Sequence, residues 1–178
     1  MLRILIDGYN MIGQADREME TLRERLVKRL NEYSLSRKHE ITVVFDGWKS
    51  GLPVENSEKS GAVMVIYSRL GEKADDVIKR MVSGKKGGWI VVSSDREIER
   101  FSMSCGCTVI SSAEFEERID RVIKQGKSYT EPSYISTEIL YLKDDDSEDS
   151  LIVHHKRKGN PRRPSKKERE KRRVMEKL

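Results

Sequence analysis

Acidic side chains follow several apolar runs of the sequence, close to the points where strands would end. Asp7, Asp46 and Asp95 each lie at or just beyond the end of such a run, and Asp75 and Asp76 open a segment with helical periodicity. Carboxylates gathered in one place repel one another, and hard cations bound through oxygen relieve that repulsion. An all-oxygen ligand set favours Mg²⁺ or Mn²⁺ over Zn²⁺. Two such ions about 4 Å apart could clamp a phosphodiester and activate water.

The first of these stretches also contains an amide and a glycine. Gly8 directly follows Asp7 and would let the backbone bend sharply at little steric cost, and Asn10 would lie at the mouth of the sheet. Each acid also has a structural interpretation that stays open. Asp7 could cap the turn that follows its strand, and Asp75 and Asp76 could complement the positive end of a helix.

Short apolar runs alternate with amphipathic segments, which predicts an α/β domain with a mostly parallel sheet. The expected strands cover residues 2–6, 41–45, 63–67, 89–92 and 107–110, and the expected helices cover 15–36, 74–82, 94–103 and 111–124. The polar segment 48–61 is rich in Gly, Ser and Pro and is expected to be a loop. Carboxyl ends of parallel strands meet at one edge, so Asp7, Asp46, Asp75 and Asp95 are expected to converge.

Two helices are predicted to begin with a capping box, in which a hydroxyl residue precedes Glu by three positions. Ser94 with Glu97 fits this pattern after the fourth strand, and Ser111 with Glu114 fits it after the fifth. These patterns predict that a helix follows each of these strands almost immediately.

Other kinds of site have little support in the sequence. The three histidines and two cysteines have no metal-ligand spacing, and no Ser/His/Asp triad is apparent. Neither a Walker-type loop nor the GxGxxG spacing occurs, so no nucleotide cofactor is expected. Cys105 and Cys107 flank a single glycine, a poor framework for a disulfide fold, and are interpreted as reduced thiols near a buried strand. No apolar run could cross a bilayer and no secretory pattern is present, so a cytoplasmic protein is expected.

Charge is distributed unevenly along the 178 residues. Residues 154–178 hold 12 Lys or Arg and 3 Glu, a net charge of +9, whereas the whole chain carries +5, so the remainder carries −4. We therefore expect a domain over 1–125, a linker with an acidic run over 126–153, and a basic tail over 154–178 that is disordered in isolation but could form a helix on a polyanion. The tail residues expected to contact RNA are Lys156, Arg157, Lys158, Arg162, Arg163, Lys166 and Lys167.

Four motifs in order resemble one known family. They are ILIDGYN at residues 4–10, VVFDG at 43–47, GEKADDVI at 71–78 and VVSSD at 91–95, and together they resemble the YacP-like branch of the NYN domain over about residues 1–125. The resemblance implies a PIN-like three-layer fold with five parallel strands and a metal-dependent ribonuclease site. It implies site positions at Asp7, Asn10, Asp46, Asp75 and Asp95, with Asp76 a weaker match to the motif.

These observations together favour a cytoplasmic Mg²⁺- or Mn²⁺-dependent endoribonuclease that acts on RNA, free or on the ribosome. Arg69, Lys73 and Lys79 flank the expected site and could contact RNA phosphates, or could simply form a solvated surface. An alternative is a non-catalytic RNA-binding or ribosome-associated factor on the same fold. A phosphatase is disfavoured because the first motif lacks the second acid of an Asp-x-Asp loop. The number of metal ions and the oligomeric state stay open.

Overall fold

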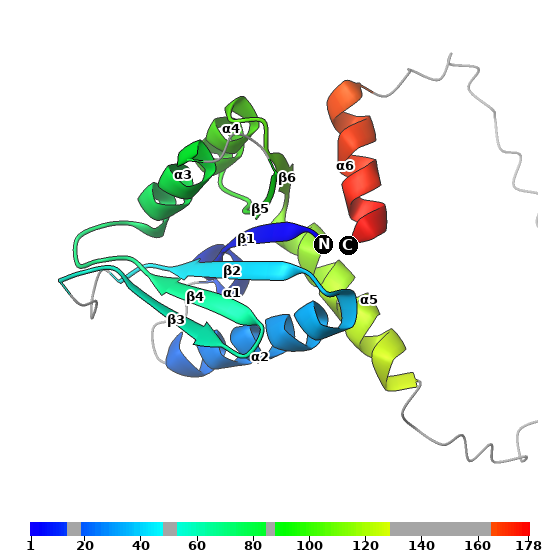
Figure 1. Ribbon diagram of the computed structural model, residues 1–178, viewed down its shortest axis with the longest axis horizontal. Coiled ribbons are helices and arrows are strands. Elements are labelled where there is room, and N and C mark those ends of the chain that lie inside the picture. The colour runs from blue at the N-terminus through cyan, green and yellow to red at the C-terminus, as the bar shows by residue number, and fades with distance from the viewer. Residues whose placement is uncertain (14–18, 48–52, 85–87, 129–164) are drawn as a thin grey trace, which may run out of the picture.

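The computed structural model describes residues 1–13, 19–47, 53–84, 88–128 and 165–178 (Figure 1). Its central element is a six-stranded sheet in the order β3-β4-β2-β1-β5-β6. The strands are β1 (Arg3–Asp7), β2 (Glu40–Phe45), β3 (Asn56–Ser60), β4 (Val63–Tyr67), β5 (Trp89–Val92) and β6 (Thr108–Ile110). Five of them run parallel, and β3 pairs antiparallel with β4. The expected α/β fold with five parallel strands is confirmed, with one further edge strand.

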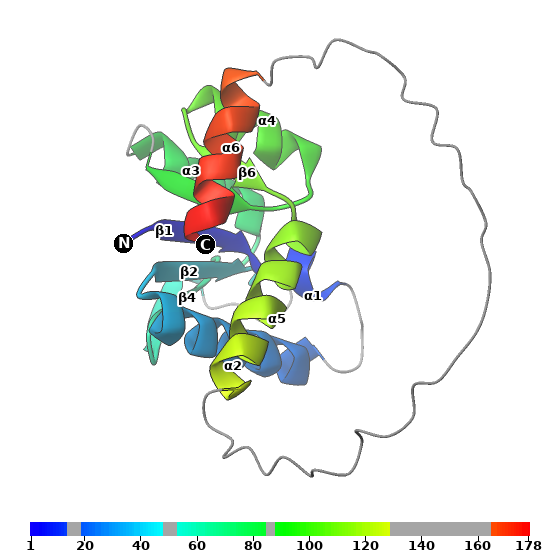
Figure 2. The ribbon, with the colours of Figure 1, turned by 90° about the vertical axis from the view of Figure 1, so that its right-hand side faces the viewer.

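Helices cover both faces of this sheet, which makes three layers (Figures 1 and 2). The helices are α1 (Gly8–Ile12), α2 (Met19–Arg37), α3 (Ala74–Gly84), α4 (Arg96–Ser104), α5 (Ser112–Ser128) and α6 (Lys166–Lys177). Figure 1 shows α3 and α4 on one face of the sheet and α2 with α5 on the other. No helix in the described part of the chain is both long and apolar enough to span a membrane.

Successive side chains of β1 point to opposite faces of the sheet and belong to two separate hydrophobic cores. Ile4 and Ile6 belong to the cluster that includes α2 and α5, whereas Leu5 belongs to the cluster that includes α3 and α4. All three side chains are fully buried. A parallel strand covered on both faces needs a continuous apolar run, and this requirement is why the sequence pattern identified β1, β2 and β5.

Two elements lie where no helix or strand was expected. The strand β3 consists of Asn, Ser, Glu, Lys and Ser, so it has no apolar alternation. It forms because Gly61, with φ of +62°, turns the chain into β4, whose register pairs Ser60 with Val63. The helix α1 has only five residues, too few for helical periodicity to show in the sequence.

The basic C-terminal segment differs from the expectation of a disordered tail, because residues 166–177 form α6 against the domain. Leu178 is fully buried, and Val174 and Met175 pack on the core cluster shared by α2 and α5. The Tyr33 hydroxyl donates a buried hydrogen bond of 2.7 Å to the Leu178 backbone oxygen. Burial of these apolar side chains supplies the stability that the charged sequence of an isolated helix lacks. Lys156, Arg157, Lys158, Arg162 and Arg163 lie outside the described residues.

Candidate active site

The order of the strands reverses at the boundary between β1 and β5. From β1 the chain continues to β2 and β4 on one side, and later returns to place β5 and β6 on the other. Ligands of open α/β sheets bind outside the carboxyl ends of strands at such a switch point. Asp7 is the last residue of β1, and the pairing of Ile6 with Val92 places Ser93 next to it.

Asp7 is a buried carboxylate held by two hydrogen bonds. Its Oδ1 accepts from the Asn10 backbone N–H at 3.2 Å, which caps α1, and its Oδ2 accepts from the Ser93 hydroxyl at 3.2 Å. Only 6% of the residue is exposed. Burial raises the pKa of Asp7 to about 6; the two hydrogen bonds oppose this rise, and the nearby charges of Asp75 and Asp95 add to it.

Asp75 and Asp95 share the electrostatic environment of Asp7. Asp75 lies in the first turn of α3, and partial burial raises its pKa, with a further contribution from the charge of Asp95. Asp95 is the N-cap of α4, and its Oδ1 accepts from the Glu97 and Ile98 N–H groups at 2.6 and 3.1 Å. The structure therefore brings three of the expected acids together, close enough for the charges of Asp75 and Asp95 to raise the pKa of Asp7.

The N-cap position of Asp95 corrects the expected capping box of Ser94 and Glu97. The box of Ser111 and Glu114 is confirmed: the Ser111 N–H donates to Glu114 Oε2 at 3.0 Å, and the Glu114 N–H donates to Ser111 Oγ at 3.3 Å. Asp95, and not Ser94, is the N-cap of α4, because its carboxylate accepts hydrogen bonds from two backbone N–H groups at once.

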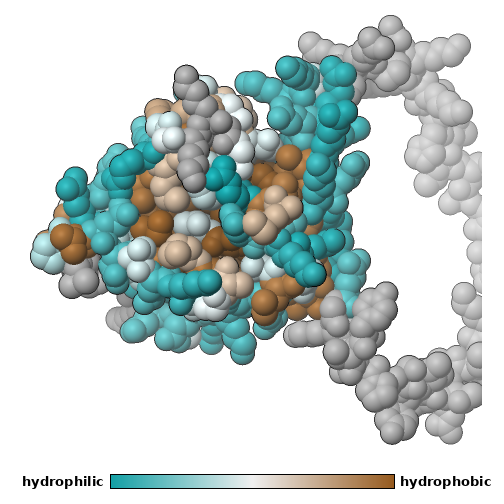
Figure 3. Space-filling model, in the orientation of Figure 1, coloured by the Kyte–Doolittle hydropathy of each residue, from teal (hydrophilic) through white to brown (hydrophobic). Residues whose placement is uncertain are grey.

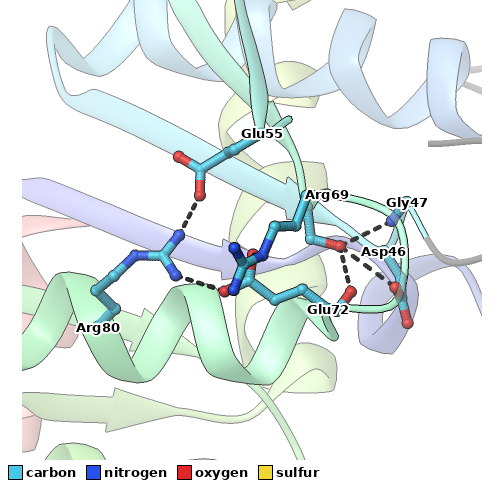
Figure 4. A network of polar contacts seen from close by, with 7 residues as sticks. Asp46, Gly47, Glu55, Arg69, Glu72 and Arg80 are labelled. Atoms are coloured by element: carbon cyan, nitrogen blue, oxygen red, sulfur yellow. Dashed lines mark hydrogen bonds and ion pairs between the residues drawn. The ribbon is translucent and has the colours of Figure 1, made fainter. Parts of the chain in front are cut away.

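Asp46 follows β2 at the same edge of the sheet, where a buried serine organises the backbone around it (Figure 4). The Ser68 hydroxyl accepts from the Gly47 N–H at 2.9 Å and donates to the Glu72 carbonyl at 2.6 Å, and it also lies 3.4 Å from Asp46 Oδ1. The Glu72 carboxylate forms ion pairs with Arg69 and Arg80, and Arg80 also pairs with Glu55. This network joins the end of β2 to the connection between β4 and α3.

Asn10 occupies the expected edge, but its side-chain oxygen is engaged inside the protein. Asn10 Oδ1 accepts from the Ser94 N–H at 3.0 Å and from the Ser112 hydroxyl at 3.1 Å. The amide therefore connects α1 to the β5–α4 connection and to the first turn of α5. In this arrangement Asn10 positions the segments that carry Asp7 and Asp95.

Gly8 is required by close packing rather than by a sharp bend. A Cβ atom at this position would lie 2.3 Å from Phe45 Cε1 and 2.9 Å from the Val44 carbonyl oxygen. Gly8 is already the first residue of α1, so the chain enters a helix directly after Asp7. The absence of a side chain lets α1 approach β2.

The other expected site residues are exposed or engaged in ion pairs. Asp76 is exposed, in contrast to the half-buried Asp75 beside it. Lys79 forms an ion pair with Glu97, Arg69 pairs with Glu72, and Lys73 is exposed. Lys166 and Lys167 are exposed at the start of α6. The three flanking cations thus border the site, two of them in ion pairs.

Sequence reasoning missed the serines that hold the acids. Ser93 and Ser68 are almost fully buried, at 2% and 1% exposure, and each touches an expected site residue. Both directly follow an apolar strand, so their position after β5 and β4 was a usable signal. Their partners are Asp7, at the end of β1, and Asp46, just after β2, and no local sequence pattern reveals these contacts.

The donor chemistry of the site suits a hard divalent cation, because the side chains that converge offer carboxylate oxygens. Among the residues that the structure describes, no three His, Cys, Asp or Glu side chains form a complete metal-binding cluster. Mg²⁺ commonly takes only one or two protein carboxylates and fills its shell with water and substrate phosphate. An open set of acids is compatible with that mode of binding.

Comparison with known proteins identifies the family. The model of the YacP-like NYN domain matches residues 4–173. The chain belongs to the YacP-like NYN domain family. The match extends beyond residue 125, the expected limit of the resemblance, and reaches into α6. NYN domains are predicted ribonucleases and are generally metal-dependent.

Solved structures support the same fold. The chain resembles the crystal structure of Rae1 (YacP) from Bacillus subtilis with a TM-score of 0.58 and 22% identity, covering 72% of this chain and 79% of that chain. A crystal structure of a point mutant of the same Bacillus subtilis protein gives the same score and identity, with 80% of its chain covered. No curated protein matches the chain.

Proposed function

We propose that this NYN domain is a Mg²⁺- or Mn²⁺-dependent endoribonuclease that acts in RNA processing or decay. The observation that carries the proposal is Asp7, a carboxylate with 6% exposure kept beside Asp75 and Asp95 at the switch point of the sheet. Burying a carboxylate near two others is unfavourable for the isolated protein. Such an arrangement is typical of a functional site.

The acids of the proposed site share one task, and neighbouring groups orient Asp7 for it. Asp7, Asp46, Asp75 and Asp95 would hold the cation, directly or through water. When bound, the cation would lower the pKa of a water molecule and neutralise charge on the phosphodiester. Ser93 and the Asn10 N–H fix both oxygens of Asp7, so that its orientation is set before substrate binds.

The flanking cations would contact the substrate rather than the reacting atoms. Arg69 and Lys73 lie on the connection between β4 and α3, held to Asp46 and Gly47 by Ser68. Their positive charges would bind RNA phosphates next to the acids and partly offset the repulsion between acids and RNA.

Incubation of structured RNA with the purified chain tests this proposal. We expect cleavage with Mn²⁺, none with EDTA, and none with Asp95→Asn in Mn²⁺. Asn is also a good N-cap, so α4 should be retained in this variant. Glu117→Gln, an exposed change on α5, should cleave like the parent. RNA binding without cleavage in Mn²⁺ would instead favour the non-catalytic RNA-binding factor.

A further inference from the structure

A groove begins at the candidate site and runs between α2 and the β3–β4 hairpin. Its volume is about 650 Å³, inside the range of roughly 300–1,000 Å³ common for small-molecule sites. Asp46 and Gly47 line one part of it, so it is continuous with the edge of the sheet that carries the acids. Asn31 from α2, Asn56 from β3 and Tyr67 from β4 line other parts.

Tyr67 and Arg23 line the groove, and they contact the rings of Phe45 and Tyr9. Tyr67 stacks on Phe45 with ring centroids 5.8 Å apart, and Tyr9 meets the same ring edge-on at 5.6 Å. The Arg23 guanidinium lies 5.3 Å from the Tyr9 ring centroid and donates to the Tyr9 hydroxyl. Within the described residues, the buried Arg23 Nε has no hydrogen-bond partner. The Tyr67 ring and the Arg23 guanidinium are the flat groups that line the groove, and unpaired bases stack on groups of this kind.

The net negative charge of the groove would repel an RNA phosphate backbone. Glu20, Glu24 and Glu58 line it together with Asp46, whereas Arg23 and Lys28 are its basic members, so carboxylates outnumber cations. Burial raises the pKa of Tyr67, and the nearby charge of Glu58 is the next largest cause, so this carboxylate lies close to the ring. Carboxylates accept hydrogen bonds from exocyclic amino groups, as from N4 of cytosine.

We propose that this groove receives an unpaired nucleobase of the RNA strand next to the scissile phosphate, and that it prefers bases with an exocyclic amino group. The proposal rests on the proposed function for the identity of the ligand, since Asp46, one of the acids of the proposed cleavage site, lines the groove. The negative walls admit the base and leave the phosphates to Arg69, Lys73 and the solvent-exposed side of the site.

Nucleosides test the groove without phosphates, and therefore without contributions from the cleavage site or from basic residues elsewhere. Cytidine and uridine form a matched pair, because an amino group at position 4 replaces a carbonyl oxygen. Titration of each into the isotopically labelled full chain, followed by backbone amide NMR signals, gives the dissociation constants and the place of binding.

We expect cytidine to shift signals of Asn56–Ser60 and Tyr67 and to bind at least about fivefold more tightly than uridine. Glu58→Gln, an exposed change on β3, should remove this preference, whereas Glu117→Gln on α5 should keep it. Equal affinity for the two nucleosides, shifts confined to other surfaces, or tighter binding of spermidine than of cytidine would overturn the proposal. Cleavage of RNA without cytidine binding would contradict base binding in the groove but not the proposed ribonuclease activity. Cytidine binding without cleavage would support base binding in the groove and contradict the proposed ribonuclease activity.

Discussion

At the scale of one residue, Asp7 shows how a functional group can lower the stability of the folded protein. Its pKa is raised from 3.8 to about 6 in the folded chain, so the folded state holds its proton more tightly than the unfolded state. The free energy of unfolding should therefore fall as the pH rises from about 4 to above 6. Without a cation, the ionised carboxylate is a destabilising group at neutral pH.

Asp7→Asn should thus stabilise the metal-free protein. At pH 7 in EDTA we expect the free energy of unfolding to rise by up to about 3 kcal/mol, because the shift of the pKa is removed. The gain should shrink as the pH is lowered toward 4, where Asp7 is protonated in the parent. Thermal and urea unfolding across this pH range measure the effect. A variant less stable than the parent at pH 7 would contradict the buried, crowded state of Asp7.

At this scale the sequence predicted the acids but not their supports. Asp7, Asp46 and Asp95 were identifiable because each follows a buried strand, and parallel strands bring such positions to one edge. The contact between Ser93 and Asp7 depends on β5 lying next to β1, a pairing across 86 residues of sequence. No local pattern contains that pairing.

At the scale of elements, Ser68 holds the connection between β4 and α3 against the end of β2 through its hydrogen bonds. Ser68→Ala would leave the Gly47 N–H and the Glu72 carbonyl without this buried partner. We expect a loss of about 1–3 kcal/mol in the free energy of unfolding. Ser83→Ala, which removes an exposed hydroxyl bonded to the Lys79 carbonyl, should change it by less than about 0.5 kcal/mol. Similar losses in both variants would argue against the proposed role of Ser68.

Helices and strands were predictable from the sequence where they bury a hydrophobic face. Phe115, Ile119 and Val122 recur at helical spacing and are all buried in α5, as the pattern indicates. The strand β3 was not predictable in this way, since all its side chains are polar and its pairing comes from the neighbouring β4. The N-cap of α4 was misplaced by one residue because two capping residues, Ser94 and Asp95, stand side by side.

At the scale of the whole molecule, the C-terminal part of the basic tail packs on the folded domain as α6. Figure 3 shows α6 as a hydrophilic column whose neighbours on the side of the sheet are hydrophobic. Lys171 pairs with Glu114, and Arg118 donates to the Met175 carbonyl, so polar contacts support the buried Leu178. A cut after Val153 would therefore expose core surface as well as remove charge. The contribution of α6 to RNA binding has to be tested by substitution.

Neutralising the exposed face of α6 should weaken RNA binding without unfolding the domain. The combined variant Lys166→Gln, Lys167→Gln, Arg172→Gln and Arg173→Gln removes four charges from exposed positions. For each RNA phosphate that the variant no longer neutralises, the slope of log affinity against log salt should become shallower by about 0.7 on single-stranded RNA. RNA titrations at several salt concentrations measure this slope.

The control variant removes the same number of charges elsewhere on the surface, through Lys38→Gln, Lys59→Gln, Arg121→Gln and Lys124→Gln. Its salt slope should stay closer to that of the parent, because these positions do not form one continuous face. Equal reductions in the two variants would mean that net charge alone, and not α6, attracts RNA.

The proposed cleavage of RNA depends on a cation held by acids at one edge of the sheet, and two adjacent residues test this dependence most directly. Asp75 is half-buried and raised in pKa by burial and by Asp95, whereas Asp76 beside it is exposed. RNA cleavage rates in Mn²⁺ should fall by at least about a hundredfold in Asp75→Asn, since a cation site supplies several kcal/mol of transition-state stabilisation. Asp76→Asn, with the same loss of charge, should reduce the rate far less. Equal rates for the two variants, or a larger reduction with Asp76→Asn, would contradict the proposed site.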